Sequence, residues 1–166
     1  SISAQAQIAS PEAFTNLSWE MVKEDKIETE HGVIQSVCAT EDYIIYLENV
    51  LDGSGQPDIV KAYYRKDQDE NGNPVEPYSL AKQVQETDYE HANGMAYNPN
   101  TNEIAVSLYT SYQSENRGCL FIMDADTLKW KRKVKVSDAY NILGIGYDLK
   151  NDRYVIQTNQ DGDYQF

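Results

Sequence analysis

The sequence has little of what the common catalytic and metal-binding motifs require. Its 166 residues include 2 cysteines and 2 histidines. It contains no Cys-x-x-Cys pair, no His-Glu-x-x-His segment, no glycine-rich phosphate loop and no Gly-x-Ser-x-Gly nucleophile elbow. A zinc site is therefore not expected. The same absences count modestly against an enzyme, because active sites are also assembled from scattered loops that carry no short motif.

Positive charge and long apolar runs are scarce as well. The chain has 14 lysines and arginines against 27 aspartates and glutamates, which gives a formal net charge of -13. Such an acidic chain repels nucleic acid and anionic membrane surfaces, so no nucleic-acid partner is expected. No apolar run approaches the roughly 18 residues that a membrane-spanning helix needs, so no membrane span is expected either.

The two cysteines are not placed for an obvious disulfide bond. Cys38 and Cys119 fall in different predicted strands, at positions that do not correspond. This arrangement favours two thiols that pack as small buried apolar groups over a disulfide between them.

What the sequence does contain is a repeated pattern of short strands. Residues 91–109 predict a strand (94–97), a polar turn (98–102) and a second strand (104–109). The turn combines three asparagines with a proline, residue types that adopt the backbone angles of tight turns. A β-hairpin is therefore expected here.

This hairpin recurs along the chain. Gly94 corresponds to Gly144 and Tyr97 to Tyr147, while a looser copy begins at His31. The first two copies are each followed by a second predicted pair of strands, at 59–65 with 78–84 and at 119–124 with 128–136. Repeats of roughly 40 to 50 residues with four short strands each are typical of β-propeller blades. The expected fold is therefore all-β, with blades of four antiparallel strands starting near residues 31, 91 and 141.

Three segments resemble a known group of proteins. The run Ile122-Met-Asp-Ala-Asp-Thr-Leu-Lys129, followed by a basic and apolar strand, resembles the outer hairpin of surface-layer-type and NHL-like bacterial β-propellers. Gly94-Met-Ala-Tyr-Asn-Pro99 and Gly144-Ile-Gly-Tyr-Asp148 resemble the first strand of their blades. The resemblance covers about residues 31–160. It implies a fold and no particular function, because propellers serve as binding modules and as enzymes alike.

The repeats are too few for a closed propeller. Residues 14–166 hold about two and a half blades, whereas propellers usually close with about four to eight. An open arc leaves strand edges and sheet faces uncovered, so we expect self-association or further blades to complete it. Residues 1–13 are expected to be flexible and do not form an intact signal peptide. Because surface-layer-type relatives are often exported, the resemblance implies a secreted or cell-surface protein.

One loop contains the start of a calcium-binding pattern. Asp67, Asp69 and Asn71, followed by Gly72, match the opening of an EF-hand loop, in which oxygen-bearing side chains surround one calcium ion. The twelfth position holds Tyr78 instead of the glutamate that completes such a loop. Two interpretations stay open, a calcium loop or a long solvated hairpin that turns at Asn71 and Gly72, and the second is favoured. No other cofactor is expected.

Three residues are candidates for ligand binding. His31 and His91 each precede the first strand of a predicted blade, near the rim of a propeller where ligands bind, and histidines there could bind a ligand or a metal or transfer protons. The alternative is that each histidine forms hydrogen bonds within a connection between blades. Tyr112 lies in a polar loop, where an aromatic ring can stack on a sugar or pack against a protein. The alternative for the 13 tyrosines as a group is that aromatic residues are simply favoured in strands.

Taken together, these features predict a non-enzymatic binding or interaction module of an exported bacterial-type propeller protein, with a protein or a carbohydrate as its ligand. Two alternatives stay open. One is a propeller hydrolase or lyase with its site at the central channel, and the other is a structural surface scaffold.

Overall fold

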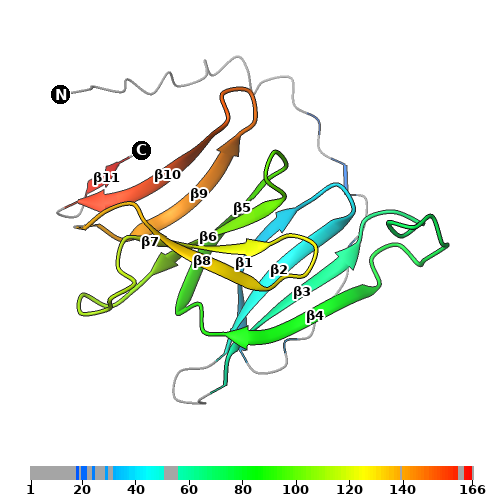
Figure 1. Cartoon of the computed structure of the whole chain (residues 1–166), viewed down its shortest axis with the longest axis horizontal. Coiled ribbons are helices and arrows are strands. Elements are labelled where there is room, and N and C mark those ends of the chain that lie inside the picture. The colour runs from blue at the N-terminus through cyan, green and yellow to red at the C-terminus, as the bar shows by residue number, and fades with distance from the viewer. Residues whose placement is uncertain are drawn as a thin grey trace.

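The structure is a computed structural model, shown in Figure 1. It describes residues 18, 20, 21, 24, 29, 32–50, 56–138, 140–160 and 163–165. The segment 1–13 and His31 lie outside the described residues. Every element in the described part of the chain is a β-strand, so the prediction of an all-β fold is confirmed.

Three antiparallel sheets are formed, each from strands that follow one another in the chain (Figure 1). Sheet 1 contains β1 (Gly32–Ala39), β2 (Tyr43–Val50), β3 (Asp58–Tyr64) and β4 (Leu80–Thr87). Sheet 2 contains β5 (His91–Asn98), β6 (Glu103–Tyr109), β7 (Cys119–Asp124) and β8 (Trp130–Lys135). Sheet 3 contains β9 (Ile142–Asp148), β10 (Arg153–Gln160) and the short β11 (Asp163–Gln165). The predicted four-stranded antiparallel units are thus present twice.

Sheet 2 is the middle layer and supplies both cores. Every residue of β6 except its last is buried. Because successive side chains of a strand point to opposite faces, Ile104 and Val106 join a core with Ile45 of sheet 1, whereas Ala105 joins a second core with Ile142 of sheet 3. Full burial of a valine or isoleucine side chain contributes roughly 1.5–3 kcal/mol, so these two cores hold the three sheets together.

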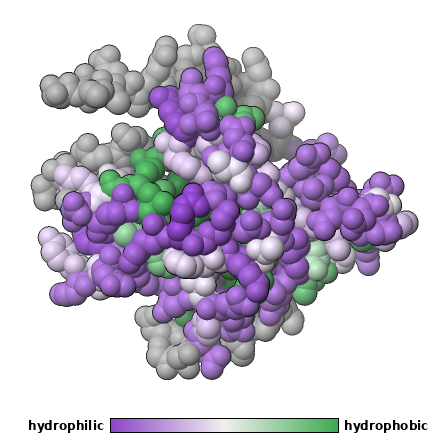
Figure 2. Space-filling model, in the orientation of Figure 1, coloured by the Kyte–Doolittle hydropathy of each residue, from purple (hydrophilic) through white to green (hydrophobic). Residues whose placement is uncertain are grey.

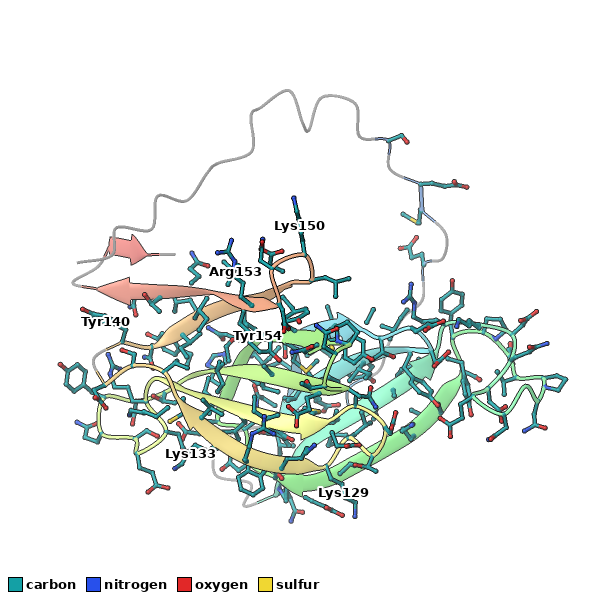
Figure 3. All side chains as sticks on the ribbon, turned by 45° about the horizontal axis from the view of Figure 1, so that its top comes forward. Lys129, Lys133, Tyr140, Lys150, Arg153 and Tyr154 are labelled. Carbon is teal, nitrogen blue, oxygen red and sulfur yellow. The ribbon has the colours of Figure 1, made fainter. Side chains whose placement is uncertain are left out.

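The first strands of the three sheets lie next to one another. β5 contacts both β1 and β9, so the first strand of sheet 2 lies between the first strands of sheets 1 and 3. Sheet 3 forms a separate layer beside sheet 2 in Figure 3, with Tyr154 on the side toward sheet 2 and Arg153 and Lys150 on the side away from it. The visible face in Figure 2 is mostly hydrophilic, with hydrophobic residues in a few small patches.

Each first strand contains a β-bulge at the same place. The extra residue is Gln35 in β1, Asn93 in β5 and Leu143 in β9. The residue after the bulge is Ser36, Gly94 or Gly144, which confirms the predicted match between the two glycines. A Cβ atom on Gly94 would lie 3.3 Å from the backbone nitrogen of Ile145, so the close approach of sheet 3 requires a small residue there.

The bulges also correct the alignment of the two histidines. His91 lies two residues before the bulge of sheet 2 and pairs with Tyr109. The residue two before the bulge of sheet 1 is Val33, which pairs with Asn49. Matching His31 to His91 was therefore wrong. The reason is that, counted from the bulge, the β5–β6 hairpin is two residues longer than the β1–β2 hairpin, since Gly94 pairs with Ser107 whereas Ser36 pairs with Leu47. The first strands and the second strands of the two sheets therefore do not share one sequence offset.

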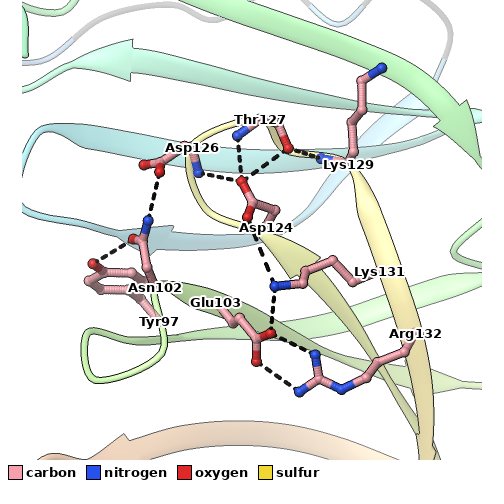
Figure 4. A network of polar contacts seen from close by, with 9 residues as sticks. All are labelled: Tyr97, Asn102, Glu103, Asp124, Asp126, Thr127, Lys129, Lys131 and Arg132. Carbon is pink, nitrogen blue, oxygen red and sulfur yellow. Dashed lines mark hydrogen bonds and ion pairs between the residues drawn. The ribbon is translucent and has the colours of Figure 1, made fainter.

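The basic segment 129–135 is paired with carboxylates of sheet 2, of sheet 1 and of the adjoining loops. Figure 4 shows the side chains of Lys131 and Arg132, which leave β8 and meet the carboxylate of Glu103 in β6. Arg132 donates two hydrogen bonds to it, at 2.6 and 2.8 Å, and Lys131 lies 2.8 Å away. The pKa of Glu103 is lowered to about 2, mainly by the hydrogen bonds from Arg132 and to a smaller extent by Lys131. The charges of this outer strand are thus paired within the fold.

The sequence also predicts free cysteines and no membrane span. Cys38 and Cys119 are both free, and burial raises the pKa of the Cys38 thiol to about 12. Within the described ranges, the structure has no helix of the length and apolarity that crossing a membrane requires.

Candidate functional site

An open hollow of about 1330 Å³ lies at one end of the three sheets. We call it the crossing hollow, because it adjoins the two crossings, residues 88–90 and 136–141, that lead from one sheet to the next. It is lined by the end of β2, the starts of β1, β3 and β5, the end of β6 and the loop that follows β6. Residues distant in the sequence therefore share one concave surface, the usual setting for a binding site.

His91 and Tyr112 both line this hollow. The imidazole Nε2 of His91 is 2.9 Å from the amide oxygen of Gln35, on the first strand of the neighbouring sheet. Its ring also meets the ring of Tyr109 edge-on, with 6.0 Å between the ring centres. Two of the three predicted ligand-binding residues are thus brought to one surface, while the third, His31, lies outside the described residues.

Two buried asparagines join neighbouring sheets beside the hollow, and we call them the amide bridges. Asn49, at the end of β2, donates to the carbonyl of Glu90 at 2.5 Å and accepts from the backbone N–H of Ala92 at 3.0 Å. Asn141, just before β9, accepts from the backbone N–H and the hydroxyl of Thr110, both at 3.0 Å, and donates to its carbonyl at 2.9 Å. Backbone groups that no strand partner satisfies are therefore paired by side chains from the adjacent sheet.

Asp58 stabilises the same end of sheet 1. Its carboxylate accepts hydrogen bonds from the backbone N–H of Val50 at 2.8 Å and of Tyr89 at 2.6 Å. Burial raises the pKa of Asp58 and the nearby charge of Asp88 adds to this, although the backbone donors act in the opposite direction. The residue is only 4% exposed, so it acts as a structural acceptor beneath the hollow.

The loop after β6 is held in place by Glu90. One carboxylate oxygen of Glu90 accepts hydrogen bonds from the hydroxyl of Ser114 and the amide of Asn116, both at 2.7 Å. The loop carries Tyr112, whose ring is covered on one side by the guanidinium of Arg117, 4.5 Å from the ring centre. Tyr112 is 80% exposed, so the loop presents an aromatic ring at the edge of the hollow.

The predicted calcium residues lie at the other end of sheet 1, in the loop between β3 and β4. One oxygen of Asp69 accepts from the backbone N–H groups of Asn71 and Asn73, at 2.9 and 2.8 Å, and the other accepts from the Asn73 amide at 2.9 Å. These bonds lower the pKa of Asp69. Gly72 has a φ of 79°, a left-handed value that suits glycine at a turn. The loop is thus a hairpin closed by its own side chain, and calcium binding by Asp67, Asp69 and Asn71 stays a prediction.

The crossing hollow gathers polar and aromatic groups of several kinds. Among them, the imidazole of His91 is paired with the side-chain amide of Gln35. In the part of the chain that the structure describes, no group of three His, Cys, Asp or Glu side chains is placed to hold a metal ion. Aromatic rings, amides and carboxylates line the hollow, together with Arg117, and such groups can bind polar ligands by stacking and hydrogen bonding.

Several residues of the hollow were not predicted. Three of them are single polar residues at strand ends, namely Asn49, Asn141 and Glu90. Each forms hydrogen bonds with partners that lie 24 or more positions away in the sequence. Arg117 carries no motif either. The signal available was the position of Asn141 at the start of a repeat, where sheet 2 has His91.

Comparison with known proteins does not assign the chain to a family. No protein-family model matches it, and no curated protein matches it.

Proposed function

We propose that this chain is a segment of a β-propeller and acts as a non-enzymatic binding module, with its ligand held at the crossing hollow. The observation that carries the proposal is the meeting of His91, Tyr109 and Tyr112 with the polar ends of three sheets at one open hollow. The aromatic rings, amides and carboxylates that line the hollow support binding over the hydrolase or lyase alternative, because such groups hold polar ligands by stacking and hydrogen bonding. The resemblance to exported bacterial propellers supports a secreted or cell-surface location.

The arrangement of the sheets supports the propeller. Two four-stranded antiparallel sheets and a third, smaller one pack face to face, with their first strands β1, β5 and β9 adjacent, as around a propeller axis. Each of the two crossings is joined to the neighbouring sheet by one amide bridge, and each first strand has its bulge at the same place. The bulged first strand is therefore the repeated feature, whereas the two amide bridges come from different positions, one at the end of β2 and one just before β9.

Both ends of the arc support completion by further sheets or by self-association. Asn159 holds the place in β10 that Asn49 holds in β2, and its buried amide oxygen has no hydrogen-bond partner among the described residues. At the other end, Ile34 and Val37 of β1 are 39% and 61% exposed. Their counterparts in β5, Ala92 and Met95, are buried against sheet 1, at 0% and 6% exposed. An additional sheet at either end would satisfy these groups.

A binding screen with variants of the hollow tests the proposed function. The chain is screened by thermal shift and calorimetry against soluble oligosaccharides and peptides. For any ligand that binds, we expect His91→Ala and Tyr112→Ala to weaken binding by roughly tenfold, the contribution of one good contact. Trp130→Ala, an exposed aromatic residue on the outer strand β8, is the control and should bind normally. Binding that survives both hollow variants would place the ligand elsewhere and refute the proposal.

A further inference from the structure

The aromatic surface of the crossing hollow is exposed without a role in the core. Tyr112 and Tyr109 are 80% and 41% exposed, and neither ring belongs to the two hydrophobic cores. A single exposed aromatic residue is ordinary, but two beside one hollow form a surface on which a flat apolar group can stack. The ring of Tyr112 is the more open of the two.

The loop that carries Tyr112 is ordered before any ligand binds. Glu90 accepts two side-chain hydrogen bonds from Ser114 and Asn116, and Lys133 donates to the Asn116 amide oxygen at 2.9 Å. Backbone hydrogen bonds from Ser114 to Ser111 and from Arg117 to Ser114 close its turns. A ligand that stacks on Tyr112 therefore loses little free energy to ordering the loop.

Arg117 determines which face of the Tyr112 ring is available. Its guanidinium lies 4.5 Å from the ring centre and so occupies one face as a cation–π partner. The other face is left for a ligand, as the exposure of the residue indicates. Because the ring already has a cationic partner, a second cation gains less from it than an uncharged group that presents C–H bonds.

The charge of the hollow disfavours acidic ligands. Of the residues that the structure describes, four carboxylates line it, those of Asp58, Glu86, Asp88 and Glu90, whereas Arg117 is the one lysine or arginine. Asp58 and Glu90 are engaged within the fold, but Asp88 uses one oxygen for the backbone N–H of Glu90 at 2.7 Å and keeps another acceptor. Phosphates, sulfates and uronic acids would meet like charge here.

Resting on the proposed function, we infer that the ligand of the crossing hollow is an uncharged oligosaccharide, with one pyranose ring stacked on Tyr112. The apolar C–H face of a pyranose fits the open face of the tyrosine ring. Its hydroxyl groups can donate to the carboxylate of Asp88 and exchange hydrogen bonds with the Gln35 and His91 pair, all of which line the same hollow. A basic peptide is the alternative that the acidic lining would also attract, and it is less favoured because Arg117 already fills the cationic position at the ring.

Calorimetry with four probes tests this inference. Chitohexaose and cellohexaose are the uncharged oligosaccharides, oligogalacturonate is the acidic one, and an arginine-rich hexapeptide represents basic peptides. We expect at least one uncharged oligosaccharide to bind and oligogalacturonate not to bind. Tyr112→Ala should weaken binding by about tenfold or more, while Tyr112→Phe, which keeps the ring, should stay within about threefold. Trp130→Ala should bind like the unmodified chain.

Each other outcome overturns the inference in a distinguishable way. Binding of the peptide alone, lost in Tyr112→Ala, would refute the sugar and leave the proposed function standing. Binding of an uncharged oligosaccharide that Tyr112→Ala does not weaken would refute the stacking site and count against the crossing hollow as well. Failure of all four probes would refute the oligosaccharide, and the wider screen of His91→Ala and Tyr112→Ala would then decide the proposed function by itself.

Discussion

The two ends of the sheets use polar side chains in different ways. At the end with the tight hairpin turns, Asp69, Asp124 and Asp148 accept hydrogen bonds from side chains or backbone groups within five residues of themselves. At the crossing end, Asn49 and Asn141 bind backbone groups 31 to 43 positions away. The turn end therefore uses more local bonds, although Asn100 also reaches Tyr147 and Asp152 in the hairpin of sheet 3, whereas the crossing end depends on the packing of one sheet against the next. Long-range bonds of this kind leave a hollow whose walls come from several strands.

The largest expected effect is on the amide bridges. Asn141→Ala removes three hydrogen bonds and leaves the buried N–H and C=O of Thr110 unpaired, which should lower the free energy of unfolding by about 2–4 kcal/mol. The matched control is Asn151→Ala at the turn end. There the side-chain amide donates a hydrogen bond to Asp148 at an exposed site, so the loss of unfolding free energy should stay below about 0.5 kcal/mol. Chemical denaturation of both variants measures the difference. Equal losses would mean that the two ends are not distinct.

A smaller effect is expected at low pH from the pairing of Glu103 with Arg132. Because the pKa of Glu103 is lowered to about 2, its stabilising effect is fully present above its ordinary value of 4.5 and is lost as the pH falls toward 2. Glu103→Gln should therefore be destabilised by roughly 1–3 kcal/mol at pH 7 and differ less from the unmodified chain at pH 3. Denaturation midpoints at the two pH values measure this. A difference that does not shrink on acidification would argue against the ion pair.

The smallest effect is expected from calcium at the loop between β3 and β4. Asp69 already accepts three hydrogen bonds from the loop, so a bound ion would have to compete with them. If Asp67, Asp69 and Asn71 do bind calcium, the melting temperature should rise with calcium and fall with chelator, and Asp69→Asn should abolish the response. An unchanged melting temperature in the unmodified chain would end the calcium hypothesis.

Local patterns predicted the sheets well and the hollow only in part. Hairpin turns, alternating apolar residues and the repeat around Gly94 and Gly144 are local signals, and they indicated the strand pairs of sheets 1 and 2 and the pair of β9 and β10, although not β11. The hollow depends on which residues neighbouring sheets bring together. His91 and Tyr112 were found because the repeat placed one near a rim and composition placed the other in a loop. Asn49 and Glu90 could not be found, because their partners are determined by packing between sheets and by a bulge that shifts the register.

The claim that the crossing end is the binding end can be tested directly by NMR. Chitohexaose or another ligand found in the screen is titrated into the ¹⁵N-labelled chain, and changes in the backbone amide shifts are mapped onto the sheets. The account predicts that the changes gather at His91 and at residues 109–117, while the turn residues Asn100 and Asn151 stay unaffected. Changes concentrated at the hairpin turns, with the crossing end unmoved, would contradict it.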